Sequence, residues 1–148
     1  MDVEIREMDI ADLNQVVQIE NESFVAPWSS KDILYELNES PISHFLVAVI
    51  NNVVVGFCDY WITYDSATIA QIAVDTKYRR LKIATKLLEE VISDCYAKRA
   101  MNITLEVRSH NESAIRLYEK NGFERVLLKP KYYTNGDDAL YMLRKVEM

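Results

Sequence analysis

The sequence of 148 residues contains only three glycines, three prolines and two cysteines. So few glycines and prolines leave no segment with the composition of a flexible linker, and the length fits one domain over residues 1–148. Cys58 and Cys95 lie far apart without a CxxC spacing, which favours buried thiols in a reducing compartment over a disulfide. His44 and His110 form no cluster with cysteine or carboxylate residues at ligand spacing, so we expect no metal site.

Long apolar runs are also absent from the sequence. The longest, residues 45–50, is far too short to span a membrane. No basic segment followed by an apolar one opens the sequence, so we expect no secretory signal. Because 49% of the residues are apolar, disorder is not expected either. These absences together favour a folded cytoplasmic protein that is not bound to a membrane.

The net charge of −6 argues against general nucleic-acid binding, yet one segment carries the opposite charge. Residues 76–88 contain no acid and hold five cations: Lys77, Arg79, Arg80, Lys82 and Lys86. We call these five residues the cationic block. A local cationic block in an acidic chain indicates a small polyanionic ligand. Charge alone slightly favours the alternative, which is a solvated face of a surface helix.

Hydrophobic periodicity predicts the element order β-α-α-β-β-β-α-β-α-β-β, which is typical of an α/β (α+β) protein with a mixed sheet. The segment "SATIAQIAVD" is apolar on both faces, which favours a central strand. The helix that follows has one apolar stripe, formed by Ile83, Leu87, Leu88, Val91, Ile92 and Cys95. The last segment, "FERVLLKPKYYTNGDDALYMLRKV", predicts two strands around a "TNGDD" turn.

Local signals predict where several elements begin and end. Asp9 is the expected N-cap of the first helix, and the second helix starts near Ser29 or Ser30. Asn111 is the expected N-cap of the last helix, and Gly122 is its expected left-handed C-terminal residue. "NN" at residues 51–52 predicts a tight hairpin turn.

The cationic block falls between a central strand and the start of a helix. At such a helix start, unpaired backbone N–H groups and the positive end of the helix dipole favour an anion. Lysine in a first helical turn is mildly unfavourable, by about 0.3–1 kcal/mol, so several cations there make more sense beside a phosphate. The block is therefore a candidate phosphate site.

The strand "IAVD", the segment "YRRLKIATKLL" and the segment "LEVRSHNESAIRLYEKNGF" together resemble the GNAT superfamily of acetyl-CoA-dependent N-acetyltransferases. Within it, the chain is most similar to the ribosomal-protein-alanine N-acetyltransferase (RimI-type) family. The resemblance covers nearly the whole chain and includes "PWS" at residues 27–29 and "KYYTNGDDALYM" near the end. It implies the GNAT fold, a central sheet of about seven strands flanked by four helices, with acetyl-CoA as the acetyl donor.

The pyrophosphate loop of the family has the form Q/R-x-x-G-x-G/A. The resemblance places it at Arg79, Arg80, Leu81, Lys82, Ile83 and Ala84, followed by Thr85. Lys82 departs from this pattern, because glycine there allows unusual dihedral angles and a close backbone approach. If the loop is already helix-like at this point, lysine keeps its N–H in place and its side chain adds a contact to phosphate.

The other cofactor contacts that the resemblance implies come from a strand and from a helix start. Backbone groups of Ile72, Ala73 and Val74 pair with the pantetheine arm, as an added strand would. These residues can also be read as core strand alone, and both readings can hold. Asn111 is either a cofactor contact or simply an N-cap.

The resemblance implies that Glu106 is the general base and Tyr118 the general acid, with Tyr118 also touching the cofactor. A carboxylate can take the proton of the attacking amine, directly or through water, and a phenol can give one to the departing thiolate. Without the resemblance, Glu106 reads as a residue on the polar face of a strand. Tyr118 reads as a core tyrosine on the stripe of Ala114 and Leu117.

Four further residues are expected on the acceptor side. Tyr132 and Tyr133 are adjacent in a predicted strand and so should point to opposite faces, one into the core and one along the peptide channel. Trp28 and Ser29 lie in the predicted turn between two helices that borders the acceptor in such folds. Trp28 can also be a packing residue only.

The α-amine of a protein N-terminus is the acceptor that we expect, because its pKa near 8 makes it easier to deprotonate than a lysine side chain. The family points to the N-terminal alanine of a small-subunit ribosomal protein, whose basic character suits an acidic enzyme. Two alternatives stay open: a GNAT enzyme for a small amine, and a non-catalytic acyl-CoA-binding module. We expect no direct contact with nucleic acid, and a monomer or weak homodimer.

Overall fold

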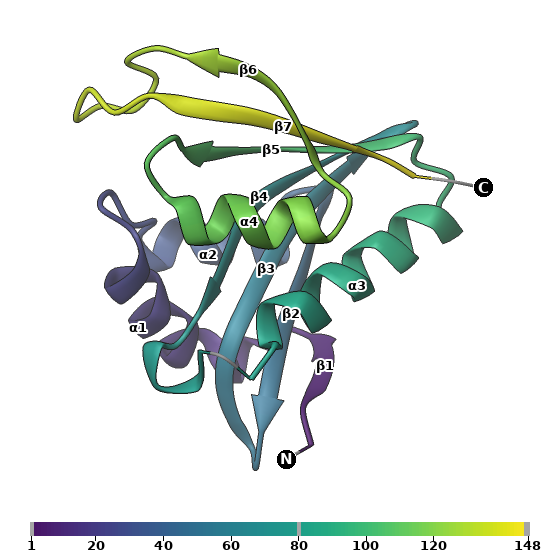
Figure 1. Ribbon diagram of the computed structural model, residues 1–148. Helices are drawn as coiled ribbons and strands as arrows, with labels where there is room; N and C mark the ends of the chain where they lie inside the picture. The colour runs from purple at the N-terminus through teal and green to yellow at the C-terminus, as the bar shows by residue number, and fades with distance from the viewer. Residues whose placement is uncertain (1, 80, 147–148) are drawn as a thin grey trace.

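The computed structural model describes residues 2–79 and 81–146, and a seven-stranded sheet organises them (Figure 1). The strands are β1 (Glu4–Glu7), β2 (Ser43–Ile50), β3 (Val53–Thr63), β4 (Ser66–Val74), β5 (Asn102–Arg108), β6 (Glu124–Lys129) and β7 (Ala139–Lys145). The α-helices are α1 (Leu13–Ser23), α2 (Ser30–Asn38), α3 (Ile83–Ala97) and α4 (Glu112–Lys120), and the 3-10 turns are η1 (Ile10–Asp12) and η2 (Thr76–Tyr78). Over the described residues, the predicted order of strands and α-helices is confirmed.

The strands lie in the order β1-β2-β3-β4-β5-β7-β6, so the apolar β4 is central, as its composition predicted. Helices α3 and α4 cover one face of the sheet, and α1 and α2 cover the other (Figure 1). On the first face Leu87 and Ile115 share one core with Ile103 of β5. On the second face Ile19 and Ile33 share another core with Phe57 of β3. Because side chains alternate along a strand, core membership tells which face each strand residue points to.

Strands β4 and β5 separate soon after they meet. They pair in parallel at only three positions: Ser66 with Asn102, Ala67 with Ile103 and Thr68 with Thr104. Beyond these pairs β4 continues to Val74 and β5 to Arg108, but neither has the other as a partner. We call this gap, between residues 69–74 and residues 105–108, the wedge. Figure 1 shows β5, β7 and β6 turned steeply away from β2, β3 and β4.

Local signals positioned several helix and turn boundaries correctly. Ser29 is the N-cap of α2, where its hydroxyl accepts a hydrogen bond from the backbone N–H of Asp32. The side chain of Asn111 caps α4 in the same way, through the N–H of Ala114. Asn51 and Asn52 both have positive φ, which is the conformation that a tight hairpin turn requires.

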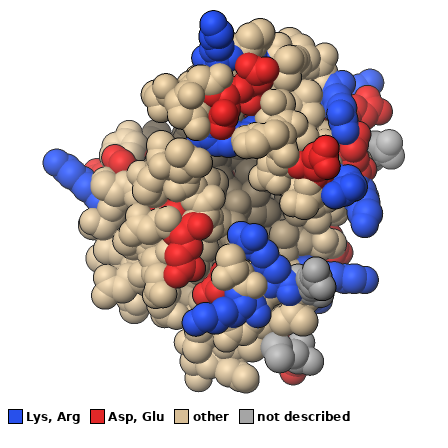
Figure 2. Space-filling view, turned by 60° about the vertical axis from the view of Figure 1, so that its left-hand side comes forward, with Lys and Arg blue, Asp and Glu red and all other residues tan. Residues whose placement is uncertain are grey.

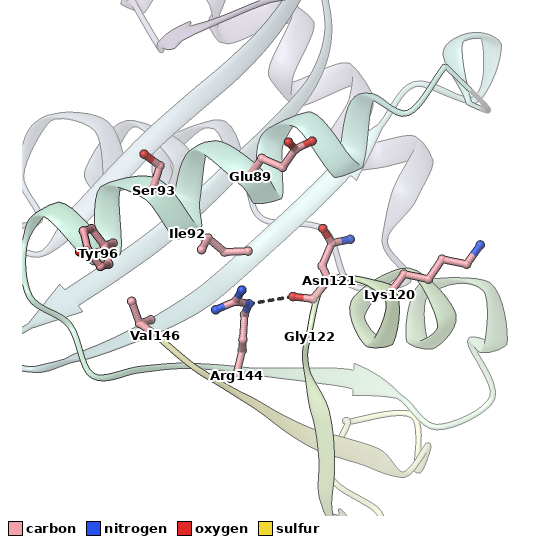
Figure 3. Close-up of a pocket in the computed structure, with 9 residues that line it drawn as sticks. All are labelled: Glu89, Ile92, Ser93, Tyr96, Lys120, Asn121, Gly122, Arg144 and Val146. Atoms are coloured by element: carbon pink, nitrogen blue, oxygen red, sulfur yellow. Dashed lines mark hydrogen bonds between the residues drawn. The ribbon is translucent and has the colours of Figure 1, made fainter. Parts of the chain in front are cut away.

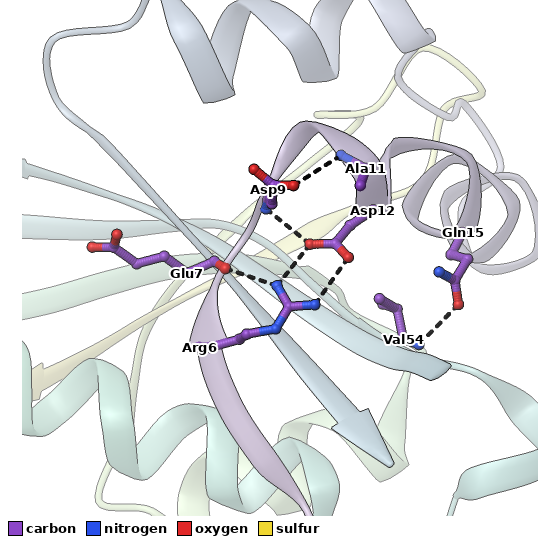
Figure 4. Close-up of polar contacts among 7 residues, drawn as sticks. All are labelled: Arg6, Glu7, Asp9, Ala11, Asp12, Gln15 and Val54. Atoms are coloured by element: carbon purple, nitrogen blue, oxygen red, sulfur yellow. Dashed lines mark hydrogen bonds and ion pairs between the residues drawn. The ribbon is translucent and has the colours of Figure 1, made fainter. Parts of the chain in front are cut away.

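Polar contacts at the N-terminal end fix α1 against the sheet (Figure 4). Asp9 caps η1 rather than a full helix, and Asp12 accepts two hydrogen bonds from the Arg6 guanidinium. The hydrogen bond from Arg6 holds the pKa of Asp12 below its ordinary value. One turn further along, Gln15 accepts a hydrogen bond of 2.9 Å from the backbone N–H of Val54 in β3.

The prediction of a strand through Tyr132 and Tyr133 is wrong. Strand β6 ends at Lys129, and residues 130–138 form a loop without strand pairing. Pro130 lacks the N–H that a ladder needs, and Lys131 takes a left-handed φ of 52°. Its backbone N–H donates 2.9 Å to the carboxylate of Asp138, which closes the loop. The two tyrosines are therefore placed by a loop and not by strand alternation.

No helix in residues 2–79 and 81–146 is long and apolar enough to cross a membrane. The same residues contain no group of three or more His, Cys, Asp or Glu side chains that could hold a metal ion.

Candidate active site

Glu106 lies on β5 beside the wedge, on the face that carries α1 and α2. Its neighbours Leu105 and Val107 point into the opposite core, under α3 and α4. The Glu106 carboxylate accepts a hydrogen bond of 2.6 Å from Lys129 Nζ and one of 3.1 Å from the Tyr132 hydroxyl. The two donors bind different carboxylate oxygens, so they fix the orientation of the group while it stays partly exposed.

The loop of residues 130–138 forms one wall beside Glu106. The Arg108 guanidinium lies 3.9 Å from the centre of the Tyr133 ring and forms an ion pair of 2.7 Å with Asp137. Tyr132 meets Tyr133 edge to face, with ring centroids 5.1 Å apart. Tyr132 is exposed and Tyr133 half-buried, and neither belongs to a hydrophobic core cluster. The prediction that one of the two tyrosines lies in the core is therefore wrong, and the expected place of the other along the peptide channel stays a prediction.

Tyr118 lies on α4, on the opposite face of the sheet from Glu106. Its ring is 7% exposed and packs edge to face on Phe123. Burial raises the pKa of Tyr118 well above its ordinary value, and the neighbouring Cys58 and Tyr133 raise it further. The phenol is therefore protonated at neutral pH.

The wedge opens the sheet between the face that carries Glu106 and the face that carries Tyr118. In a closed sheet the backbone would separate Glu106 from Tyr118. A carbonyl in the wedge would have a carboxylate on one side and a protonated phenol on the other. That arrangement suits a reaction in which an amine loses a proton and a leaving group gains one.

The β5-facing edge of β4 is an open strand edge. On its other side β4 pairs with β3, where Gly56 lies opposite Val74, Phe57 opposite Ala73 and Cys58 opposite Ile72. Among the described residues no strand pairs with the wedge side of residues 72–74. Unpaired strand backbone can bind an extended ligand as an added strand.

Helix α3 begins after β4 and the short turn η2, so its start follows the open edge of β4 in the chain. Lys82 is its N-cap residue, with φ 59° and ψ 28°, and no side chain caps the helix there. The condition that the loop be helix-like at Lys82 is therefore not met. Lys82 takes the left-handed conformation that glycine adopts without strain. The next residues, Ile83, Ala84 and Thr85, begin the helix with uncapped N–H groups.

The cationic block surrounds this helix start. Lys77, Arg79, Lys82 and Lys86 are exposed, and Arg80 lies outside the described residues. Leu81 is also exposed. Figure 2 shows a hollow in one face of the molecule with lysine and arginine side chains gathered beside it. Uncapped N–H groups, a helix dipole and exposed cations together fit a phosphate-bearing ligand.

The remaining predicted site residues have structural contacts of their own. Trp28 is half-buried against the core under α1 and α2, and its N–H donates to Glu20. Ser29 and Asn111 cap helices, as described above. The structure therefore brings Glu106, Tyr132 and Tyr133 together, while Trp28 and Ser29 lie on the turn between α1 and α2.

A separate depression of about 690 Å³ lies between α3, the end of α4 and the end of β7 (Figure 3). It is lined by Ile92, Tyr96, Gly122 and Arg144 among others. Arg144 donates 2.8 Å to the backbone oxygen of Asn121 and so holds the α4–β6 turn. None of the predicted site residues lines it.

The sequence profile of the acetyltransferase (GNAT) family matches residues 13–123. The chain belongs to this family. A Bacillus subtilis (strain 168) relative, provisionally named a [ribosomal protein bS18]-alanine N-acetyltransferase, is 37% identical over 93% of this chain and 92% of its own. The [ribosomal protein bS18]-alanine N-acetyltransferase of Escherichia coli (strain K12) is 31% identical over 97% of this chain and 98% of its own.

A solved structure, that of the NatC complex bound to Gag peptide and CoA, has the same GNAT fold. It matches with a TM-score of 0.89 and 25% identity, over 99% of this chain and all of the other (100%). As a GNAT-family member, the chain is an N-acetyltransferase and acetyl-CoA is its acetyl donor. The residues fit this donor, since α3 offers an uncapped cationic start for phosphates and β4 an open edge for an extended arm.

Sequence reasoning missed one functional candidate, Lys129. Its contact with Glu106 depends on the strand order β5-β7-β6, which brings Glu106, Tyr141 and Leu127 into one row. The ammonium of Lys129 also lies 4.9 Å from the centre of the Tyr141 ring. No signal in the sequence sets this register. The contact between Lys129 and Glu106 can be predicted only once β6 is known to be the edge strand next to β7.

Proposed function

We propose that this GNAT enzyme transfers an acetyl group from acetyl-CoA to the α-amine of a protein N-terminus. The acceptor that we favour is the N-terminal alanine of a small-subunit ribosomal protein. The observation that carries the proposal is the pair of Glu106 and Tyr118 on opposite faces of the wedge, beside an open strand edge. The names of the two curated relatives support the choice of acceptor.

The donor would lie along the wedge. The backbone of Ile72, Ala73 and Val74 would pair with its extended arm, and the loop from Arg79 to Ala84 with Thr85 would hold its phosphates. Asn111 would border the same ligand at the start of α4. Acetyl-CoA supplies the acetyl group as a thioester, whose carbonyl an amine can attack.

Each catalytic residue has one proton to move. Glu106 takes a proton from the acceptor ammonium, directly or through one water, and leaves a neutral nucleophilic amine. Tyr118, which is protonated at neutral pH because burial raises its pKa, gives its phenolic proton to the departing thiolate. One proton has then left the amine and one has reached the thiol. Lys129 and Tyr132 hold the Glu106 carboxylate in place during the transfer.

The acceptor side would be formed by Trp28 and Ser29 on one side and by Tyr132 and Tyr133 on the other. An α-amine with a pKa near 8 is about 3 kcal/mol easier to deprotonate at neutral pH than a lysine amine near 10.4. A site with one carboxylate base is therefore better matched to a protein N-terminus. The chain's net charge of −6 would favour encounter with a basic ribosomal protein in the cytoplasm.

Thiol release from acetyl-CoA tests the proposal directly. The acceptors are a peptide that begins with alanine, the same peptide blocked at its α-amine, and a panel of small amines. We expect turnover with the free peptide and none with the blocked one. Turnover on small amines alone would contradict the peptide acceptor, and donor binding without turnover on any amine would indicate a non-catalytic module.

A further inference from the structure

Three buried oxygen atoms lie close together without a hydrogen-bond partner. They are Glu20 Oε1, Asp59 Oδ2 and Gln71 Oε1, and they are the only such side-chain atoms among the described residues. Asp59 and Gln71 are opposite each other on β3 and β4, and Glu20 comes from α1, which packs over them. Buried polar groups are normally paired, so this cluster marks a place where packing and pairing were not jointly satisfied.

The Glu20 carboxylate joins two elements through one oxygen. Its Oε2 accepts 2.8 Å from the backbone N–H of Trp28 and 2.9 Å from the Gln71 amide. The side chain is fully buried, and burial raises the pKa of Glu20 although both hydrogen bonds lower it. One atom therefore connects β4, beside the wedge, to the turn between α1 and α2.

That turn has little else to hold it. Val25 is 69% exposed, and Ala26 and Pro27 are exposed as well. Among the hydrogen bonds of the described residues, the one from Trp28 to Glu20 is the only one made by residues 25–28. The position of the turn relative to β4 therefore depends on Glu20 and on the partial burial of the Trp28 ring.

We propose that Glu20 and Gln71 are positioning residues that set the separation between the Trp28 turn and β4. Gln71 directly precedes the residues that would pair with the donor, and Trp28 borders the acceptor. The inference rests on the proposed function: the Glu20–Gln71 contact aligns the acceptor amine with the thioester. Neither residue touches the reacting atoms.

A second contact fastens α2 elsewhere and supplies a contrast. The indole N–H of Trp61 donates a hydrogen bond of 2.6 Å to the Glu36 carboxylate of α2. This contact joins α2 to β3 and does not involve residues 25–28. Gln15 likewise joins α1 to β3 through Val54. Loss of either contact should loosen a helix without moving the Trp28 turn.

The test compares Glu20→Leu, Glu20→Gln and Gln71→Leu, with Gln15→Leu as the matched control in the same helix. Misplacement by about 1 Å costs up to about 10²-fold in rate. We expect Glu20→Leu and Gln71→Leu to lower kcat/KM for the alanine peptide about tenfold or more, with the Kd of acetyl-CoA unchanged. The Glu20→Gln variant keeps an acceptor oxygen and should stay close to wild type. Gln15→Leu should lower the unfolding temperature while kcat/KM stays unchanged.

The double variant Glu20→Leu/Gln71→Leu should be no worse than either single one, because the two residues form one contact. Wild-type kcat/KM in Glu20→Leu or in Gln71→Leu would overturn the inference. So would a loss in Glu20→Gln equal to that in Glu20→Leu, since it would assign the role to charge. Gln71 is partly exposed, so Gln71→Leu should fold. This variant therefore still tests the inference if Glu20→Leu does not fold.

Amide hydrogen exchange at Trp28 separates this inference from the proposed function. Wild-type enzyme that acetylates no peptide would contradict the proposed acceptor only. In that case faster Trp28 exchange in Glu20→Leu than in Gln15→Leu would support the positioning contact. Equal exchange in the two variants would overturn it.

Discussion

Lys129 and Glu106 form an ion pair across an intervening strand. Nζ of Lys129 lies 2.6 Å from Oε2 of Glu106, although β7 separates β6 from β5. Only the Tyr132 hydroxyl would hold the carboxylate in a Lys129→Met variant. We therefore expect Lys129→Met to lower kcat about tenfold while acetyl-CoA binds as before. Steady-state kinetics checks this, with Lys131→Met as a control for the loss of one charge nearby. An equal loss in the control would argue for a general charge effect.

Removal of the two proton-transfer groups should affect chemistry rather than binding. We expect Glu106→Gln and Tyr118→Phe each to lower turnover at least ~10²-fold, the usual size for acid–base catalysis. Both substitutions keep the shape of the side chain, so calorimetry with acetyl-CoA should give an unchanged Kd. A near-normal rate in either variant would remove that residue from the mechanism.

Lys82 stores conformational strain that glycine would release. A left-handed conformation costs a residue other than glycine about 1–2 kcal/mol, so Lys82→Gly should not destabilise the fold. We expect the affinity for coenzyme to change by no more than about tenfold, or ~1.4 kcal/mol. Lys82→Ala keeps the strain and loses the cation, which makes it the matched control. Calorimetry that detects no binding to Lys82→Gly would contradict this expectation.

Asp59 should make stability depend on pH in an unusual direction. Burial, together with the negative charge of the nearby Glu36, raises the pKa of Asp59 from 3.8 to about 9. The folded state therefore holds a proton that the unfolded chain releases near pH 4. This contribution is complete below the unfolded pKa and is lost as the pH rises toward about 9. Thermal unfolding at pH 5, 7 and 9 should show a fall that Asp59→Asn reduces. An identical pH profile in the variant would refute the assignment.

Gly56 on β3 lies close to β4 and to the start of α3. A Cβ atom there would lie 3.0 Å from the Ala73 oxygen and 3.4 Å from Ile83 Cγ2. Overpacking of this kind costs about 1–3 kcal/mol, so Gly56→Ala should lower the free energy of unfolding by that order. It should also weaken acetyl-CoA binding, because Ala73 and Ile83 both border the expected donor site. Denaturant unfolding and calorimetry with acetyl-CoA check these two expectations, and an unchanged stability would contradict the overpacking at Ala73 and Ile83.

The sequence was sufficient for most of the fold because each element carries its own local signal. The stripe of α3 is buried as its spacing predicted, and Ser29 and Asn111 cap the helices that they were expected to start. The catalytic roles of Glu106 and Tyr118 were predicted from a family resemblance and stay predictions. Their position on the two sides of the wedge agrees with them.

The failures concern backbone conformation and strand register, which no residue pattern encodes alone. Tyr132 and Tyr133 were assigned to a strand that was expected to continue to the "TNGDD" turn, but β6 ends at Lys129, and Pro130 and the left-handed Lys131 follow it. The left-handed Lys82 escaped notice because lysine rarely takes that conformation. Lys129 could not be paired with Glu106 without knowledge that β6 lies beyond β7.

Strands β4 and β5 pair at only three positions, so the sheet consists of two halves, β1 to β4 and β5 to β7, with few backbone contacts between them. A donor bound in the wedge would connect the two halves, because its extended arm would form hydrogen bonds with backbone groups that have no partner strand there. The free energy of unfolding would then increase with the concentration of free acetyl-CoA. The substrate of the reaction would thus also be a temporary part of the scaffold that carries it out.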